Sequence, residues 1–143
     1  MAPSQIHPQL RADCHLLGNL PASVVLLNRN AVLPWFILVP DTELVDVLDL
    51  PGPQREQVLA DCAVVSMFLK RVLGFDKVNF AGLGNVVPQM HLHIIGRRIG
   101  DPCWPKPVWG NLVGDEPYET TQLQAWQAEL TKVAALVPAS LPN

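Results

Sequence analysis

The chain has 143 residues, a net charge of −3 at pH 7 and a hydrophobic fraction of 49%. This length fits a single domain over residues 1–143, and the weak negative charge provides no basic surface for nonspecific nucleic-acid binding. No apolar run approaches the ~20 residues that a membrane helix needs, and the charges and prolines of residues 1–14 do not fit a secretory signal. Three cysteines without paired spacing favour reduced thiols over disulfides. We expect a cytoplasmic protein that binds neither membranes nor nucleic acid.

The first part of the chain predicts a pair of strands. Residues 1–21 lack a clear pattern, apart from one short helical turn around residues 9–14. Residues 22–28 and 35–39 are rich in β-branched and other apolar side chains, and turn-forming residues at 28–30 separate them. The two runs predict a hairpin with a loose connection.

A long helix is predicted after Pro51-Gly52-Pro53. Proline suits the first turn of a helix, and Gly74 suits the position after its end. Apolar residues between these limits recur at spacings of three and four, as on the buried face of a helix. They are Val58, Cys62, Val65, Leu69 and Val72. We expect this helix to pack across the sheet.

One stretch near the centre, residues 89–95, predicts both a strand and a functional site. It reads Gln-Met-His-Leu-His-Ile-Ile, so a polar residue occupies every second position of its first five. Because side chains alternate between the faces of a strand, Gln89, His91 and His93 would share one face. The preceding loop, Gly82-Leu83-Gly84-Asn85, is suited to wrapping an anion with its backbone N–H groups. Together these features predict a phosphate site.

Further elements are predicted on both sides of this stretch. Residues 77–81 predict the strand before the glycine-containing loop, with Asn79 on the same face as its neighbours two positions away. Residues 101–110 contain several prolines and tryptophans, which favours an ordered extended segment. Helical spacing of apolar residues predicts an additional C-terminal helix over about 117–137.

The stretch at 89–95 resembles the signature of the histidine triad superfamily, His-x-His-x-His-x-x with x hydrophobic. Gln89 stands where the first triad histidine normally lies, whereas His91 and His93 match the second and third. The superfamily also places an asparagine and a glycine-containing loop shortly upstream, and Asn79 and Gly84-Asn85 match these.

The order of the predicted elements agrees with this resemblance, which covers about residues 20–110. It implies an α+β fold with an antiparallel sheet of about five strands and one long helix across it, to which the C-terminal helix is an addition. The family commonly pairs two subunits, and a homodimer interface would also absorb the high apolar content.

The resemblance implies an enzyme that acts on the α-phosphate of nucleoside phosphoramidates or dinucleoside polyphosphates by hydrolysis or nucleotidyl transfer. His91 would be the nucleophile and form a covalent nucleotidyl-histidine intermediate, and His93 would hydrogen-bond the phosphate or the leaving group. Gly84 and Asn85 would hold the phosphate. The expected partner is therefore a small nucleotide, and no cofactor is expected.

Each of two asparagines, Asn28 and Asn79, has two possible roles. Asn28 stands about where many family members carry an acidic residue that binds the ribose hydroxyls; its amide can bind ribose, or it can open the turn. In the family the residue matching Asn79 helps to hold the nucleotide, and the alternative is an Asx hydrogen bond that shapes the loop.

Two departures from the family pattern bear on catalysis. Gln89 cannot carry a proton or a positive charge, and Val86-Val87-Pro88 offers no hydroxyl where related phosphoramidate hydrolases have serine or threonine. The alternative function is therefore a catalytically weakened, nucleotide-binding regulatory module.

Other readings of the two histidines rank lower. A metal site on His91 and His93 lacks a third ligand at suitable spacing, so no metal is expected. If the two histidines had a purely structural role, the glycine loop would lie beside them only by coincidence. Some nucleotidyl transferases of the superfamily have glutamine in place of the third histidine, whereas this chain has it in place of the first, so their hexose-phosphate specificity does not transfer.

Overall fold

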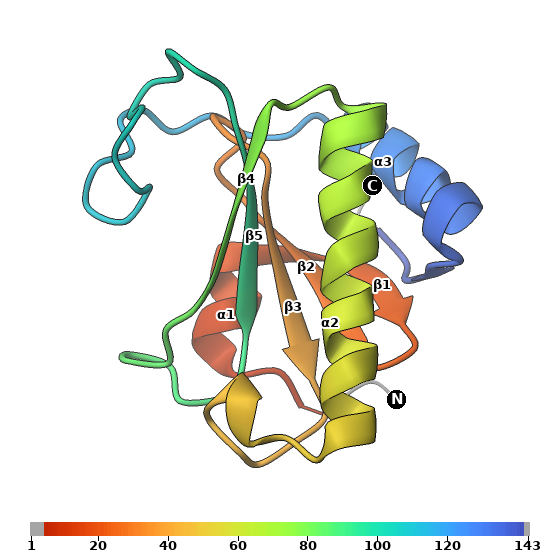
Figure 1. Cartoon of the computed structure of the whole chain (residues 1–143). Coiled ribbons are helices and arrows are strands. Elements are labelled where there is room, and N and C mark those ends of the chain that lie inside the picture. The colour runs from red at the N-terminus through yellow and green to blue at the C-terminus, as the bar shows by residue number, and fades with distance from the viewer. Residues whose placement is uncertain (1–4, 142–143) are drawn as a thin grey trace.

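The computed structural model, which describes residues 5–141, has a six-stranded antiparallel sheet at its centre (Figure 1). The strands lie in the order β4-β5-β3-β2-β1-β6. They are β1 (Cys14–Leu20), β2 (Ser23–Asn28), β3 (Trp35–Pro40), β4 (Lys77–Gly82), β5 (Leu92–Arg97) and β6 (Val137–Pro138). The helices are α1 (Pro8–Asp13), α2 (Gly52–Met67) and α3 (Thr120–Ala134), with short helical turns η1 (Val47–Asp49) and η2 (Phe68–Val72). The predicted α+β fold is confirmed, and within residues 5–141 no helix is long and apolar enough to cross a membrane.

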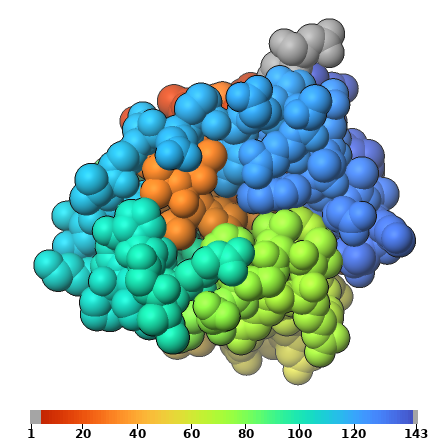
Figure 2. Space-filling view, turned by 90° about the horizontal axis from the view of Figure 1, so that it is seen from above, coloured from red at the N-terminus to blue at the C-terminus, as the bar shows by residue number. Residues whose placement is uncertain are grey.

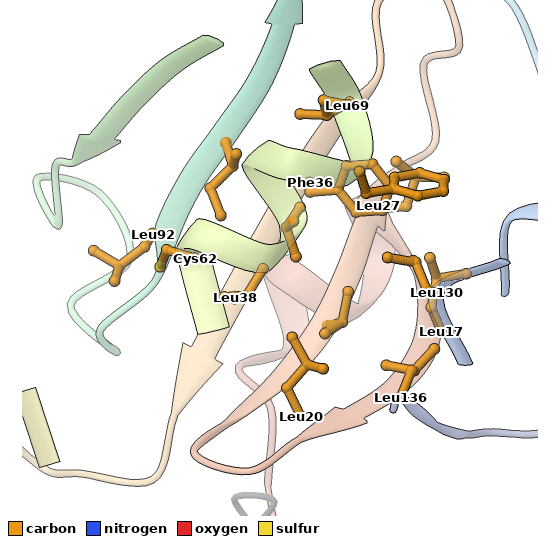
Figure 3. Close-up of a cluster of buried hydrophobic side chains, with 14 of the residues drawn as sticks. Leu17, Leu20, Leu27, Phe36, Leu38, Cys62, Leu69, Leu92, Leu130 and Leu136 are labelled. Carbon is orange, nitrogen blue, oxygen red and sulfur yellow. The ribbon is translucent and has the colours of Figure 1, made fainter. Parts of the chain in front are cut away.

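The main hydrophobic core lies between one face of the sheet and the helices α2 and α3. Phe36 is fully buried at its centre, with its ring centroid 6.0 Å from that of Phe68 and 6.1 Å from that of Trp126. Figure 3 shows how leucines of the strands meet side chains of α2 and of the C-terminal segment in this layer. The long helix thus packs across the sheet, as its apolar spacing predicts.

The ends of both long helices follow local backbone chemistry. The predicted helix after Pro53 forms as α2 and continues through the π-helical turn η2, and Gly74 follows it with a φ of 75°. Helix α3 ends earlier than predicted, because Ala135 takes a left-handed φ of 55°. Val137 and Pro138 then leave the helix axis and pair with β1 as the short strand β6.

Two elements differ from the sequence-based expectation. Residues 14–20 form β1, although they were expected to be irregular. A bulge between Leu16 and Gly18 interrupts the alternation of side chains in β1 and hides its strand pattern. The predicted strand at 89–95 begins only at Leu92, because its partner β4 ends at Gly82, the residue opposite Leu92. Pro88 also has no N–H to donate to a neighbouring strand.

The second face of the sheet is covered at two sides and open between them. Leu10 of α1 packs there against apolar side chains of β2 and β3, including Ile37. At the other side Cys103 and Val108 pack against Ile95. In the space-filling view, teal and blue atoms of the chain after β5 frame the orange connection between β2 and β3 (Figure 2). The open part between the two clusters positions the site.

Candidate active site

A pocket of about 280 Å³ opens on the second face of the sheet. Helix α1, the strands β2 and β3, the loop over residues 83–87 and the start of β5 contribute to its walls. Five of the seven residues that the sequence predicts for the site line this pocket: Asn28, Gly84, Asn85, His91 and His93. The other two, Gln89 and Asn79, do not line it.

His91 is held in one tautomer by a backbone carbonyl. The residue is 8% exposed, and its Nδ1 lies 2.7 Å from the carbonyl oxygen of Gln89. Because a carbonyl oxygen only accepts hydrogen bonds, Nδ1 carries the proton of the neutral ring. The lone pair of the neutral ring therefore lies on Nε2, and a nucleophilic imidazole attacks through its unprotonated nitrogen.

His93 is held in the opposite tautomer by a tryptophan. The indole Nε1–H of Trp35 donates to Nδ1 of His93 over 3.0 Å, which places the proton of the neutral His93 ring on Nε2. Burial, together with the neighbouring His91 at a ring-centroid distance of 4.9 Å, lowers the pKa of His93 to about 4. His93 is thus a neutral hydrogen-bond donor, with the ring of Trp109 packed edge-on at 5.0 Å.

The loop beside the histidines presents unbonded backbone N–H groups. Gly84 has a φ of 68°, a conformation that glycine adopts at little cost. The N–H groups of residues 84–87 donate no hydrogen bond to any group within residues 5–141. No lysine or arginine of the described chain lines the pocket, so its donors for an anion are uncharged groups such as these N–H groups.

Asn28 has one of its two predicted roles in this structure, the opening of a turn. Its Oδ1 accepts the backbone N–H of Asn30 at 2.9 Å, which opens the turn after β2. Its Nδ2 has no hydrogen-bond partner within residues 5–141. The carboxylate of Asp13, which lines the same pocket, accepts the Nε2–H groups of Gln9 at 3.0 Å. This end of the pocket therefore offers both an amide and a carboxylate to a polar ligand group.

Gln89 lies outside the pocket because its side chain bonds to the N-terminal segment. Its Oε1 accepts the backbone N–H of His7 at 2.7 Å, and its Nε2 donates to the carbonyl of Gln5 at 2.9 Å. The predicted alternation would place Gln89 beside the two histidines, but the chain at 89–91 is not paired as a strand.

Asn79 lies on the expected face of β4 but bonds to a buried arginine. Its Oδ1 accepts Nη1–H of Arg97 at 2.8 Å. Arg97 is 1% exposed and forms a salt bridge with Asp101 at 2.7 Å. Asp101 and Asn79 thus satisfy the guanidinium of Arg97 inside the protein. Arg98 lies at the surface, stacked over Phe75.

Among the aromatic and ionisable side chains that line the pocket, sequence reasoning missed Asp13, Trp35 and Trp109. Trp35 and Trp109 come from elements that the sequence does predict, but their approach to His93 depends on the packing of β3 and of the loop after β5. Within residues 5–141 no three His, Cys, Asp or Glu side chains gather as a metal site requires.

Two histidines with oppositely assigned tautomers lie beside a loop whose N–H groups are unbonded, on an antiparallel α+β fold. The sequence matches the HIT domain over residues 9–100. The chain therefore belongs to the HIT, or histidine triad, family, whose members are nucleotide-binding hydrolases and transferases and are often dimers.

Solved histidine triad proteins share this fold over most of the chain. A protein from Bradyrhizobium japonicum is 39% identical with a TM-score of 0.84, and the alignment covers 91% of this chain and 97% of that one. One from Marinobacter aquaeolei is 39% identical with a TM-score of 0.83, covering 92% and 96%. One from Sinorhizobium meliloti is 32% identical with a TM-score of 0.83, covering 90% and 96%. A comparison with curated proteins gives no match.

Proposed function

We propose that this protein cleaves nucleoside phosphoramidates or dinucleoside polyphosphates at the α-phosphate, through a covalent nucleotidyl intermediate on His91. The observation that carries this proposal is the hydrogen bond from Nδ1–H of His91 to the carbonyl of Gln89, which leaves Nε2 unprotonated. His91 also lines the same pocket as the loop residues whose N–H groups are unbonded.

The proposed reaction has two displacements at phosphorus. In the first, the Nε2 lone pair of His91 forms a bond to the α-phosphorus, and the bond to the leaving group breaks with its electron pair. A leaving amine takes its proton from a water molecule. In the second, this hydroxide attacks phosphorus, and the electron pair of the bond to His91 returns to Nε2. When the leaving group is a polyphosphate, a water molecule attacks instead and its proton goes to the released phosphate. During the intermediate the ring is positively charged, and the carbonyl of Gln89 stabilises it through Nδ1–H.

The remaining pocket residues fit the parts of a nucleotide. The N–H groups at Gly84 and Asn85 would donate to nonbridging phosphate oxygens, and Nε2–H of His93 would add a further donor. The free Nδ2 of Asn28 would donate to a ribose hydroxyl. Asn79 and the side chain of Gln89 take no part in these contacts, because each is bonded elsewhere.

Intact-mass analysis tests the proposal directly. Purified protein is incubated with adenosine 5′-phosphoramidate and, separately, with a diadenosine polyphosphate. We expect released mononucleotide and a transient nucleotidyl adduct, both absent in His91→Ala. His15→Ala is the matched control, because His15 lies outside the pocket and bonds to Arg29.

The same experiment separates the enzyme from a weakened binding module. Nucleotide binding without adduct or turnover would refute catalysis and favour the regulatory alternative. The absence of a hydroxyl at residues 86–88 is the feature that supports that alternative. Failure to bind nucleotide at all would refute both.

We also propose that two copies pair through the edge strand β4. One side of β4 is unpaired in the sheet, and an unpaired strand edge is a template for a further strand. Exposed apolar side chains lie near it, with Phe80 49% and Leu48 77% exposed. A groove of about 540 Å³ runs between β4 and η1.

Light scattering coupled to size exclusion tests this pairing. We expect a dimer mass for the wild type and a monomer mass for Phe80→Glu, because a buried carboxylate would oppose the pairing. Val133→Glu is the control, since Val133 is 47% exposed on α3, away from β4. A monomer mass for the wild type at all concentrations would refute the dimer.

A further inference from the structure

The side chain of Gln89 makes the same pair of hydrogen bonds that a strand residue makes in a parallel bridge. Its Oε1 accepts the N–H of His7 and its Nε2 donates to the carbonyl of Gln5, so both bonds go to the residues that flank Ile6. A side-chain amide carries its acceptor and its donor side by side, as this pair requires. The two nitrogens of an imidazole diverge, so a histidine cannot make both bonds at once.

The segment that Gln89 holds is one wall of the pocket. His7 is the N-cap of α1, and its Nδ1 accepts the backbone N–H of Gln9 at 3.1 Å. Gln9 and Leu10 of α1 line the pocket. Fixing residues 5–7 therefore fixes the start of the helix that closes this side of the site.

The backbone of Gln89 acts on the nucleophile. Its carbonyl accepts Nδ1–H of His91, and this bond determines which nitrogen of His91 has the lone pair. The carbonyl belongs to a stretch without strand pairing, since β5 starts at Leu92. The side-chain bonds of Gln89 and the burial of Met90 in the core therefore hold this carbonyl.

We propose that Gln89 is a positioning residue that ties the N-terminal segment to the carbonyl controlling the tautomer of His91. In this chain the position of the first triad histidine has a new role: the side chain bonds outward to residues 5–7, and only the backbone serves the site. The part of this proposal that concerns turnover rests on the function proposed above; the part that concerns the tautomer does not.

The test uses Gln89→Glu, because the carboxyl group has the same shape and can be switched by pH. Ionised glutamate has no donor for the carbonyl of Gln5, whereas protonated glutamate regains one. NMR of the ring nitrogens in the free protein reports the tautomer of His91. At pH 8 we expect the ratio of the Nδ1–H tautomer to the Nε2–H tautomer of His91 to fall roughly fivefold. This is the effect of losing about one hydrogen bond.

Three further results are expected from the same variant. The NMR shift of the Gln5 carbonyl carbon should change at pH 8, because this carbonyl loses its donor. The ratio of variant to wild-type kcat should be low at pH 8 and recover as the pH approaches the ordinary carboxyl range near ~4.3. KM should change less than kcat, because His91 acts on the reaction rather than on binding.

Gln127→Glu is the matched control for a general loss of stability. Nε2 of Gln127 also donates to two backbone carbonyls, those of Leu17 and Ala139, at 2.8 and 2.6 Å, but far from the pocket. We expect it to leave the His91 tautomer unchanged.

Two outcomes would overturn the proposal. One is a changed Gln5 carbonyl shift with an unaltered His91 tautomer in Gln89→Glu, which would show that the tether does not reach the nucleophile. The other is a Gln89→His variant with higher kcat than the wild type, since the position would then act through ring chemistry. Because the tautomer and the carbonyl shift are measured without substrate, failure of the proposed function leaves this test intact.

Discussion

Protonation of His93 should destabilise the folded protein on mild acidification. The folded state holds the pKa of His93 at about 4, because the ring is buried beside His91. The unfolded chain has a pKa near ~6.5 at this residue, so it binds the proton first, and stability is lost as the pH falls from 6.5 to 4. This single group should lower the free energy of unfolding by about 2 kcal/mol at pH 5 and about 3 kcal/mol at pH 4, relative to pH 8.

Denaturant unfolding of the wild type and of His93→Gln at several pH values measures this contribution. Glutamine does not titrate, so the wild type should lose stability relative to the variant by the amounts above. The salt bridge that lowers the pKa of Asp101 to about 2 is common to both proteins and cancels in the difference. Parallel stability curves between pH 7 and 4, or an NMR titration of His93 with an ordinary pKa, would refute the reasoning.

Three substitutions test the packing around the site through the free energy of unfolding. Arg97→Met should lower the free energy of unfolding by about 3–5 kcal/mol, because it leaves the buried carboxylate of Asp101 unpaired. The double variant with Asp101→Asn should lose less stability than Arg97→Met alone, and an equal loss would contradict this cause. Gly96→Ala should cost about 1–3 kcal/mol in chemical denaturation, because its Cβ would lie 2.9 Å from the ring of Phe75; an unchanged midpoint would contradict this contact. Phe36→Ala should cost about 3–5 kcal/mol by the same measurement, and a loss below 1 kcal/mol would mean that the core refills the space.

The pairing of the two histidines with the glycine loop could be predicted from sequence, because both depend on short-range patterns. Residues two apart on a strand share a face even when the strand starts late, so His91 and His93 meet although β5 begins at Leu92. Gly84 and Asn85 follow β4 directly and therefore reach the same pocket.

The partners of Gln89 and Arg97 could not be predicted, because they come from distant or irregular segments. Gln89 bonds to residues more than eighty positions earlier, in a segment without any periodic pattern. The burial of Arg97 depends on the fold of the loop that carries Asp101 and on Asn79 from the neighbouring strand. The contact of Trp35 with His93 could not be predicted either, because it joins two strands that are far apart in the sequence.

The pocket without lysine or arginine has a consequence for the choice of ligand. Its ionised lining group is the carboxylate of Asp13, and its donors are neutral N–H groups. Each additional ionised phosphate on a ligand must then give up hydration without gaining a countercharge from the protein. Of the two proposed substrate classes, a singly charged nucleoside phosphoramidate should therefore bind with a smaller desolvation cost than a polyphosphate chain, which would need to bring its own cation.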